Sequence, residues 1–441
     1  MLRLIYTLLF ALATPLILGR LWWRGQQEPR YRHNIAERFG HYSQPPLINA
    51  IWIHAVSVGE VRAAAALLAA CEKQVPQSPI LITCMTPTGR ATALELFGHR
   101  ATIAYLPYDL PIALGGLLAH FRPRCLLIME TEIWFNLVAV CRRGCVPVLL
   151  VNGRLSARSR NGYAKFAPIR ALTREALAAI TVVAAQSAAD AARFSELGAH
   201  QVVVTGNMKF DLIPDGETVA RGLSWRASMQ ASSASAPSPA AKQHVLLAAS
   251  TREGEEAMLL NAFCRIFDMS ARRDILLVIA PRHPQRFNAV LQVIMAAGLS
   301  VTTRSANPLP ANDIQVWLGD SMGEMAAYYA LCDVAIIGGS FVALGGQNLI
   351  EAASLGKPTI VGPHVFNFSD AVRLAKNSGA LMQVADADSA MRAAQSLFND
   401  PLQQRRMGEA ALQFTAMHRG ATQKTMGLIT DAMNPIFESG L

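Results

Sequence analysis

The chain has little charge: only 16% of its 441 residues are Asp, Glu, Lys or Arg, whereas 52% are hydrophobic. This composition excludes an intrinsically disordered protein, which combines low hydrophobicity with high net charge. No long Lys/Arg tract, zinc-finger spacing or aromatic ribonucleoprotein motif occurs, so no nucleic acid is expected as a partner. The length suits two or three domains, and two are expected.

Cysteine is also scarce, with seven residues and no CxxC pair. The odd number and the apolar surroundings predict reduced thiols in a cytosolic compartment. Cys141 and Cys145 have helical spacing, but no histidine lies near them in the sequence, so packing is expected there instead of a metal site. No structural metal is predicted.

The charge that is present is unbalanced, with 40 Lys and Arg against 31 Asp and Glu, a formal net charge of +9. This excess favours anionic partners such as phospholipids or phosphorylated sugars.

Residues 1–23 differ from the rest of the chain. Leu4 to Gly19 is almost unbroken apolar sequence, and it is followed by Trp22, Trp23 and a basic stretch that ends at Arg38. A full span needs roughly 20 apolar residues, so this run, which contains Pro15, is marginal. An interfacial anchor with its basic flank on the cytoplasmic side is predicted. A secretory signal and an apolar helix packed on the protein body are the alternatives.

From Ile51 onward, short β-branched or Leu-rich runs alternate with longer helical ones, the pattern of parallel sheets with crossover helices. The first series of expected strands covers residues 51–57, 80–85, 102–106, 125–130, 147–151, 182–186 and 202–206. The second covers residues 244–249, 275–280, 315–318, 334–337 and 358–361. The sequence therefore predicts two Rossmann-like domains, residues 24–215 and 216–441, with a low-complexity loop near 229–242.

Ligands of open parallel sheets bind beyond the carboxyl ends of the strands, where helix N-termini also present free N–H groups. Four of these turns have the form [Ser/Asn]-x-x-Glu, and capping boxes would explain all of them without chemistry. The pairs are Ser57 with Glu60, Ser250 with Glu253, Ser321 with Glu324, and Asn348 with Glu351.

The turns of the second domain are also rich in glycine, and Arg282 lies in one of them. Glycines allow a close approach of the backbone to a ligand, and an arginine supplies a forked donor, so a nucleotide phosphate is the expected ligand. No P-loop or dinucleotide motif occurs at these turns, which disfavours ATP hydrolysis and NAD chemistry.

In the first domain, Glu130 and Glu132 end an expected strand, while Arg154 and Lys209 follow others. The two carboxylates are too close in sequence to flank a glycosidic bond as a hydrolase pair. Arg154 and Lys209 are candidate anion contacts, with ordinary surface charge as the alternative.

Eight ordered motifs resemble one family, the 3-deoxy-D-manno-octulosonic acid (Kdo) transferases of Gram-negative lipopolysaccharide synthesis. They are SVGE, METEIW, NGRLS, STxEGEE, PRHPxRF, GDSMGE, GGSF followed by GGQN, and GPHVFNF. The resemblance implies a GT-B architecture, inverting transfer without a metal or cofactor, CMP-Kdo as donor and the tetraacyl lipid A precursor as acceptor at the cytoplasmic side of the inner membrane. The first domain would then bind the acceptor and the second the donor.

The resemblance also implies roles for individual residues. Glu60 matches the general base, Glu130 and Lys209 match residues that support the transition state, and Ser57 and Arg154 are candidate contacts for Kdo or acceptor anions. The implied CMP-binding residues are Pro281, Arg282, Met322, Gly323, Glu324, Asn348, Leu349, Ile350 and Glu351. The chain departs from the family at Arg252 and Gln347, where histidine is usual.

Two other functions stay open at this point. One is a different GT-B transferase or an epimerase that uses a nucleoside diphosphate sugar. The other is an inactive, membrane-bound protein that binds lipid A.

Overall fold

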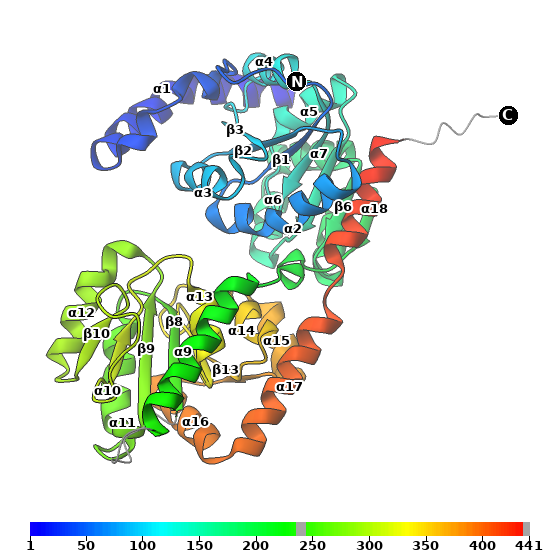
Figure 1. Cartoon of the computed structure of the whole chain (residues 1–441). Coiled ribbons are helices and arrows are strands. Elements are labelled where there is room, and N and C mark those ends of the chain that lie inside the picture. The colour runs from blue at the N-terminus through cyan, green and yellow to red at the C-terminus, as the bar shows by residue number, and fades with distance from the viewer. Residues whose placement is uncertain (235–243, 435–441) are drawn as a thin grey trace. The chain divides into compact units, whose positions relative to one another are not determined.

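The computed structural model describes residues 1–234 and 244–434. The chain divides into two compact units, Met1–Leu212 with His418–Leu441 and Ile213–Met417, and each is built on a parallel seven-stranded sheet. Helices cover both faces of each sheet (Figure 1). These are the two Rossmann-like units of a GT-B protein, as predicted.

The first unit orders its strands β3-β2-β1-β4-β5-β6-β7. The strands are β1 (Ala50–His54), β2 (Ile80–Cys84), β3 (Thr102–Tyr105), β4 (Pro123–Met129), β5 (Val148–Gly153), β6 (Val182–Ala185) and β7 (Val202–Val204). The helices are α1 (Leu2–Gln27), α2 (Val58–Gln74), α3 (Pro87–Phe97), α4 (Pro111–Phe121), α5 (Phe135–Arg143), α6 (Ala157–Lys165), α7 (Ala167–Ala179), α8 (Ala188–Glu196) and α18 (Ala421–Met433), with 3-10 turns η1 (Pro29–Arg32), η2 (Ile35–Phe39) and η3 (Met208–Asp211).

The second unit has the corresponding order β10-β11-β9-β8-β12-β13-β14. Its strands are β8 (His244–Thr251), β9 (Ile275–Pro281), β10 (Val301–Thr303), β11 (Val316–Leu318), β12 (Val334–Ile337), β13 (Thr359–Val361) and β14 (Leu381–Gln383). Its helices are α9 (Gly216–Ala234), α10 (Glu255–Ile266), α11 (Ala271–Asp274), α12 (Phe287–Ala296), α13 (Met325–Leu331), α14 (Ile350–Ser354), α15 (Ser369–Asn377), α16 (Ala387–Asn399) and α17 (Pro401–Met417), with the 3-10 turn η4 (Pro284–Arg286).

The strands are apolar on both faces because helices bury both faces of the sheet. In β1, Trp52 packs into one core with α5 and α7, whereas Ile51 and Ile53 pack into the other with α2 and α18. This alternation follows from the two-residue period of a strand. The buried layers fix the strand ends, from which the polar side chains of the site extend.

The domain boundaries differ from the sequence prediction at the C-terminus. Helix α18 packs against α2 of the first unit, and the carboxylate of Asp211 accepts hydrogen bonds from the N–H groups of Gly420 and Thr422, both at 2.6 Å. The second unit therefore ends at Met417 and not at residue 441. The expected loop near 229–242 is also partly wrong, because α9 continues to Ala234; residues 235–243 lie outside the described residues.

Helix α1 is the one described helix that is long and apolar enough to cross a membrane, with a mean hydropathy of 1.8. One of its faces packs on the first unit: Tyr6 donates a 2.9 Å hydrogen bond to Asp109 and stacks edge-on against Phe135. The opposite face exposes leucines, with Leu12 75% and Leu16 78% exposed. The helix thus has a protein-facing side and an open apolar side.

Candidate functional site

Two acidic residues of the first unit, Glu60 and Glu130, lie at the point where the strand order reverses. Strands β1 and β4 are neighbours although they are not consecutive, and the chain leaves their carboxyl ends toward opposite sides of the sheet. Such a switch point is where open α/β sheets bind ligands. Glu60 follows β1 in the first turn of α2, and Glu130 comes directly after β4.

Glu60 turns its carboxylate back toward the end of β1. The N–H of Val56 donates to Oε2 at 2.8 Å, and the hydroxyl of Ser57 donates to Oε1 at 2.9 Å. Ser57 is the N-cap residue of α2, but its side chain makes no capping hydrogen bond to the helix. The capping box, which was the alternative explanation of SVGE, does not form: the side chain of Ser57 donates to the carboxylate and accepts no hydrogen bond from the helix.

The same carboxyl group holds its proton to a higher pH than an ordinary glutamate does. Burial raises the pKa of Glu60 from its ordinary value of 4.5 to about 7, and the charges of Glu130 and Glu132 act in the same direction, against the two hydrogen bonds. A helix N-terminus alone favours the ionised form of a carboxyl group. Burial outweighs that effect, and the result is a proton acceptor poised near neutral pH.

Glu130 is held by backbone and side chain together. Its carboxylate Oε1 accepts a 3.0 Å hydrogen bond from Lys209 Nζ, so η3 brings the expected cation to the expected acid. Its backbone has φ +58°, a left-handed conformation that costs energy for a residue with a side chain and is concentrated at functional sites. Glu130 O also accepts a 3.3 Å hydrogen bond from the N–H of Arg154.

For one residue of this site, no role was predicted from the sequence. Asn152, at the end of β5, is fully buried with φ +53°, and its Oδ1 accepts from the N–H of Met208 at 3.0 Å. It thereby fixes η3, which carries Lys209. Burial also raises the pKa of Glu132, and Glu130 adds to that effect. The sequence signal for Asn152 was its position after a buried strand, as the first residue of NGRLS.

In the second unit, basic residues instead of acidic ones follow the strands near the point where the strand order reverses. Its order reverses between β8 and β12, and Arg252 follows β8 while Arg282 follows β9. Partial burial, together with the positive charges of Arg252, Arg282 and Arg286, lowers the pKa of His283. Three arginines therefore place positive charge near His283 at the carboxyl end of the sheet, where an anionic ligand can meet it, and Glu256 balances the charge of one of them, Arg286.

Two fully buried glutamates hold these loops together, and sequence reasoning missed both. Glu255 accepts from the N–H of Arg252 at 2.8 Å, of Gly339 at 2.6 Å and of Phe341 at 2.9 Å, joining the loops after β8 and β12. Glu256 pairs with both terminal nitrogens of Arg286, at 2.8 and 3.0 Å. The expected pair of Ser250 with Glu253 is wrong: α10 begins at Glu255, and Glu253 is exposed.

The expected donor residues around β11 are placed as follows. Met322 is 51% exposed and Gly323 has φ +80°. Glu324 Oε1 accepts from Arg221 at 2.9 Å and from Arg304 at 3.0 Å. Burial opposes its ionisation, but hydrogen bonds from Ser321 and the two arginines outweigh burial and lower the pKa of Glu324. Ser321 also bonds to the hydroxyl of Tyr328. Because α13 begins at Met325 with Glu324 as its N-cap residue, Ser321 and Glu324 do not form a capping box.

The remaining donor residues lie before α14 and at the end of β9. Asn348 donates to Glu351 at 3.0 Å and accepts from the N–H of Ile350 at 3.1 Å, a local pairing close to the expected one. The side chains of Leu349 and Ile350 are buried in the core, so only their backbone groups can meet a ligand. Pro281 is the buried last residue of β9.

Metal ligands are not assembled at either site. Within the described ranges, no three His, Cys, Asp or Glu side chains are grouped so that they could hold a metal ion. The seven cysteines are unpaired; Cys141 is buried as expected, but Cys145 is exposed.

Comparisons with known proteins give the family. The family model described as 3-Deoxy-D-manno-octulosonic-acid transferase (kdotransferase) matches residues 33–212, and the one described as Glycosyl transferases group 1 matches residues 299–414. A crystal structure of a glycosyltransferase from Rickettsia africae superposes with a TM-score of 0.57 at 13% identity, covering 88% of this chain and 100% of that one. This likeness concerns the fold.

Two relatives are similar over almost their whole length. The chain is 41% identical to a 3-deoxy-D-manno-octulosonic acid transferase of Bordetella pertussis, covering 97% of this chain and 99% of the relative. It is 34% identical to a protein of the same name from Haemophilus influenzae, covering 97% and 98%. The chain therefore belongs to the 3-deoxy-D-manno-octulosonic acid (Kdo) transferase family and is a glycosyltransferase.

Proposed function

We propose that the chain transfers Kdo from CMP-Kdo to the tetraacyl lipid A precursor, lipid IVA, with inversion and without a metal ion. Family membership supports the Kdo transfer. The observation that carries the mechanism is the carboxyl group of Glu60, whose pKa of about 7 suits a general base at neutral pH.

In the proposed reaction, Glu60 accepts the proton of the acceptor hydroxyl. The oxygen of that hydroxyl forms a bond to the anomeric carbon of Kdo. The bond from that carbon to the CMP phosphate oxygen breaks, and its electron pair leaves with CMP. Lys209, held by Glu130, supplies positive charge toward the Kdo carboxylate, and Arg154 and Ser57 are further candidate contacts. Fixed positive charges beside the negatively charged groups of the substrate stabilise the transition state.

The second unit is proposed to bind the nucleotide. The positive charge of Arg252, Arg282 and Arg286 suits the phosphate of CMP, and Glu255 sets the two loops beside it. Pro281, Met322, Gly323 and Glu324, with Asn348, Leu349, Ile350 and Glu351, are the other proposed contacts.

We also propose that the protein lies at the cytoplasmic side of the inner membrane through α1. One side of this helix packs on the first unit and the other exposes leucines, which suits a helix lying in the interface better than one crossing the bilayer. The helix that contains the proposed anchor, residues 1–23, runs from Leu2 to Gln27.

Incubating the protein with CMP-Kdo and lipid IVA, followed by mass spectrometry of the lipid, tests the reaction. A mass increase by one or more Kdo residues with release of CMP is expected. Thermal unfolding with CMP and with UDP tests the donor, since a ligand at 100 times its dissociation constant stabilises by roughly 2.7 kcal/mol. A larger shift with UDP would favour another nucleotide-sugar enzyme, and binding without turnover would indicate an inactive lipid-binding protein.

A further inference from the structure

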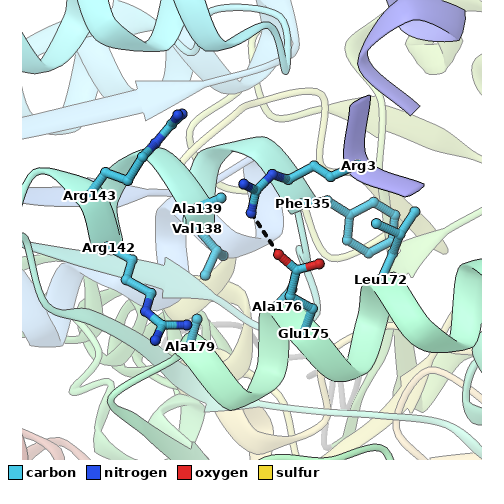
Figure 2. Close-up of a pocket in the computed structure, with 10 residues that line it drawn as sticks. All are labelled: Arg3, Phe135, Val138, Ala139, Arg142, Arg143, Leu172, Glu175, Ala176 and Ala179. Atoms are coloured by element: carbon cyan, nitrogen blue, oxygen red, sulfur yellow. Dashed lines mark hydrogen bonds and ion pairs between the residues drawn. The ribbon is translucent and has the colours of Figure 1, made fainter. Parts of the chain in front are cut away.

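A pocket on the first unit, which shares no lining residue with the Glu60 site, lies between α1, α5 and α7 (Figure 2). Its volume is about 400 Å³, within the range of small-ligand sites. The apolar part of its wall includes Phe135 and Val138 of α5 with Leu172 and Ala176 of α7. A pocket of this size and lining can hold part of a hydrocarbon chain.

Positive side chains surround this apolar pocket. Arg3 reaches it from α1, and Arg142 and Arg143 project from the last turn of α5 (Figure 2). One acid, Glu175, pairs with Arg3 at 2.6 Å, and both side chains are partly exposed at 51% and 36%. Three arginines against one glutamate leave a net charge of +2 around the pocket. The ligand that matches the pocket is therefore anionic at one end and apolar at the other.

The pocket also adjoins the open apolar face of α1. Arg3 lies in the first turn of this helix, next to Leu4 at 63% exposure and one turn before Leu8 at 56%. We propose that the pocket binds an anionic phospholipid of the bilayer, with its negative headgroup attracted by the net positive charge of Arg3, Arg142 and Arg143 and the first part of an acyl chain against the apolar part of the wall. This inference rests on the proposed membrane association of α1.

Measurements of vesicle binding distinguish lipid binding in the pocket from membrane binding by α1. The double variant Arg142→Gln/Arg143→Gln should bind vesicles containing phosphatidylglycerol about 25-fold more weakly, at about fivefold per charge, and should bind pure phosphatidylcholine vesicles as the wild type does. The matched control is Arg405→Gln/Arg406→Gln, an exposed arginine pair on α17 that should lose no more than about twofold. Equal losses in both pairs would overturn the proposal.

The negative charge of Glu175 allows a test in which the affinity for vesicles is expected to rise instead of fall. Glu175→Gln removes the only acid that lines the pocket and releases Arg3 from its ion pair, so phosphatidylglycerol vesicles should bind about fivefold more tightly. An unchanged or weaker affinity would contradict a negative headgroup attracted by these arginines.

A specific pocket is distinguished from a charged surface with a short-chain phosphatidylglycerol kept below its micelle concentration. Calorimetry should show one saturable site, and Ala179→Phe, which fills the pocket without changing charge, should weaken binding at least tenfold. Wild-type binding by Ala179→Phe would overturn the proposal, as would displacement by an equal concentration of inorganic phosphate, which would indicate a simple anion site.

Enzyme assays in detergent distinguish this pocket from the acceptor site. Arg142→Gln/Arg143→Gln should keep the wild-type kcat and KM for lipid IVA. A raised KM with unchanged vesicle binding would assign the pocket to the acceptor instead. If the wild type fails to bind neutral vesicles at all, the proposed role of α1 fails, whereas loss of the difference between the arginine pairs refutes only the pocket.

Discussion

Lys209 Nζ lies 3.0 Å from Glu130 Oε1, and this ion pair adjoins a third charged group, the carboxyl of Glu60, whose pKa Glu130 helps to raise. Of the two partners, Glu130 acts on Glu60 directly, and Lys209 acts through Glu130. Lysine partly neutralises Glu130 and so limits the repulsion between the two carboxylates.

The pair therefore shifts the pH at which activity appears, on top of the larger effect of burial. Glu130→Gln removes a negative charge and should move the acidic limb of the kcat/KM profile to lower pH, on the order of 1 unit. Lys209→Met leaves Glu130 uncompensated and should move it upward by a similar amount, with lower activity at every pH. Profiles from pH 5 to 9 measure both shifts; movement of both variants in one direction would contradict this coupling.

Ser57→Ala separates two roles of the serine. Its hydroxyl donates to Glu60 and lowers the pKa of that group, so the variant should move the acidic limb upward, on the order of 1 pH unit. A capping serine would instead cost about 1 kcal/mol of stability without a pH shift. Ser156→Ala provides that comparison, because Ser156 accepts the 3.0 Å capping hydrogen bond of α6. If Ser57→Ala behaves like Ser156→Ala, the assignment of Ser57 to the carboxylate is wrong.

Much of the fold followed from sequence, because strands buried on both faces form apolar runs of distinctive length. Strands β10 and β14 were missed, since each is a three-residue edge strand that is partly exposed. The return of α18 to the first unit was missed for a different reason. It depends on contacts such as Asp211 with the N–H of Gly420, more than 200 positions away, which no local pattern encodes.

The site was predictable in its residue types but not in its electrostatics. SVGE reads equally well as a capping box, and nothing in those four residues shows that Glu60 is buried beside two further carboxylates. Likewise, STREGEE contains three glutamates, of which Glu253 is exposed whereas Glu255 and Glu256 are buried. Which of the three glutamates face the loops depends on the residue at which α10 begins.

Glu255→Gln should disturb the second unit. The carboxylate accepts three backbone N–H groups, and an amide that turns an NH₂ group toward one of them leaves that donor unpaired, at about 1–3 kcal/mol. We expect a lower melting temperature and weaker CMP binding. The exposed Glu253→Gln is the control and should match the wild type in both measurements. Equal behaviour of the two variants would contradict the role of Glu255.

The exposed face of α1 can be tested without deleting the helix, whose other face covers Asp109 and Phe135. Leu8→Ser/Leu12→Ser/Leu16→Ser should retain the fold but lose most binding to neutral vesicles, because about 1.5–3 kcal/mol per buried leucine is removed. Leu402→Ser/Leu412→Ser/Met417→Ser changes three exposed apolar residues of α17 and should bind as the wild type does. Flotation assays compare the two; undiminished binding of the first variant would exclude α1 as the anchor.

The activity of Glu60→Gln tests the central claim most directly. Burial raises the pKa of Glu60 above 4.5, so the folded wild type loses stability as pH rises from there to about 7; the uncharged amide avoids this loss. At pH 8 the variant should therefore unfold at the wild-type temperature or above and bind CMP normally, while Kdo transfer falls about 100- to 10,000-fold. Transfer within about threefold of the wild type, in protein that is folded and binds CMP, would contradict the assignment of Glu60 as general base.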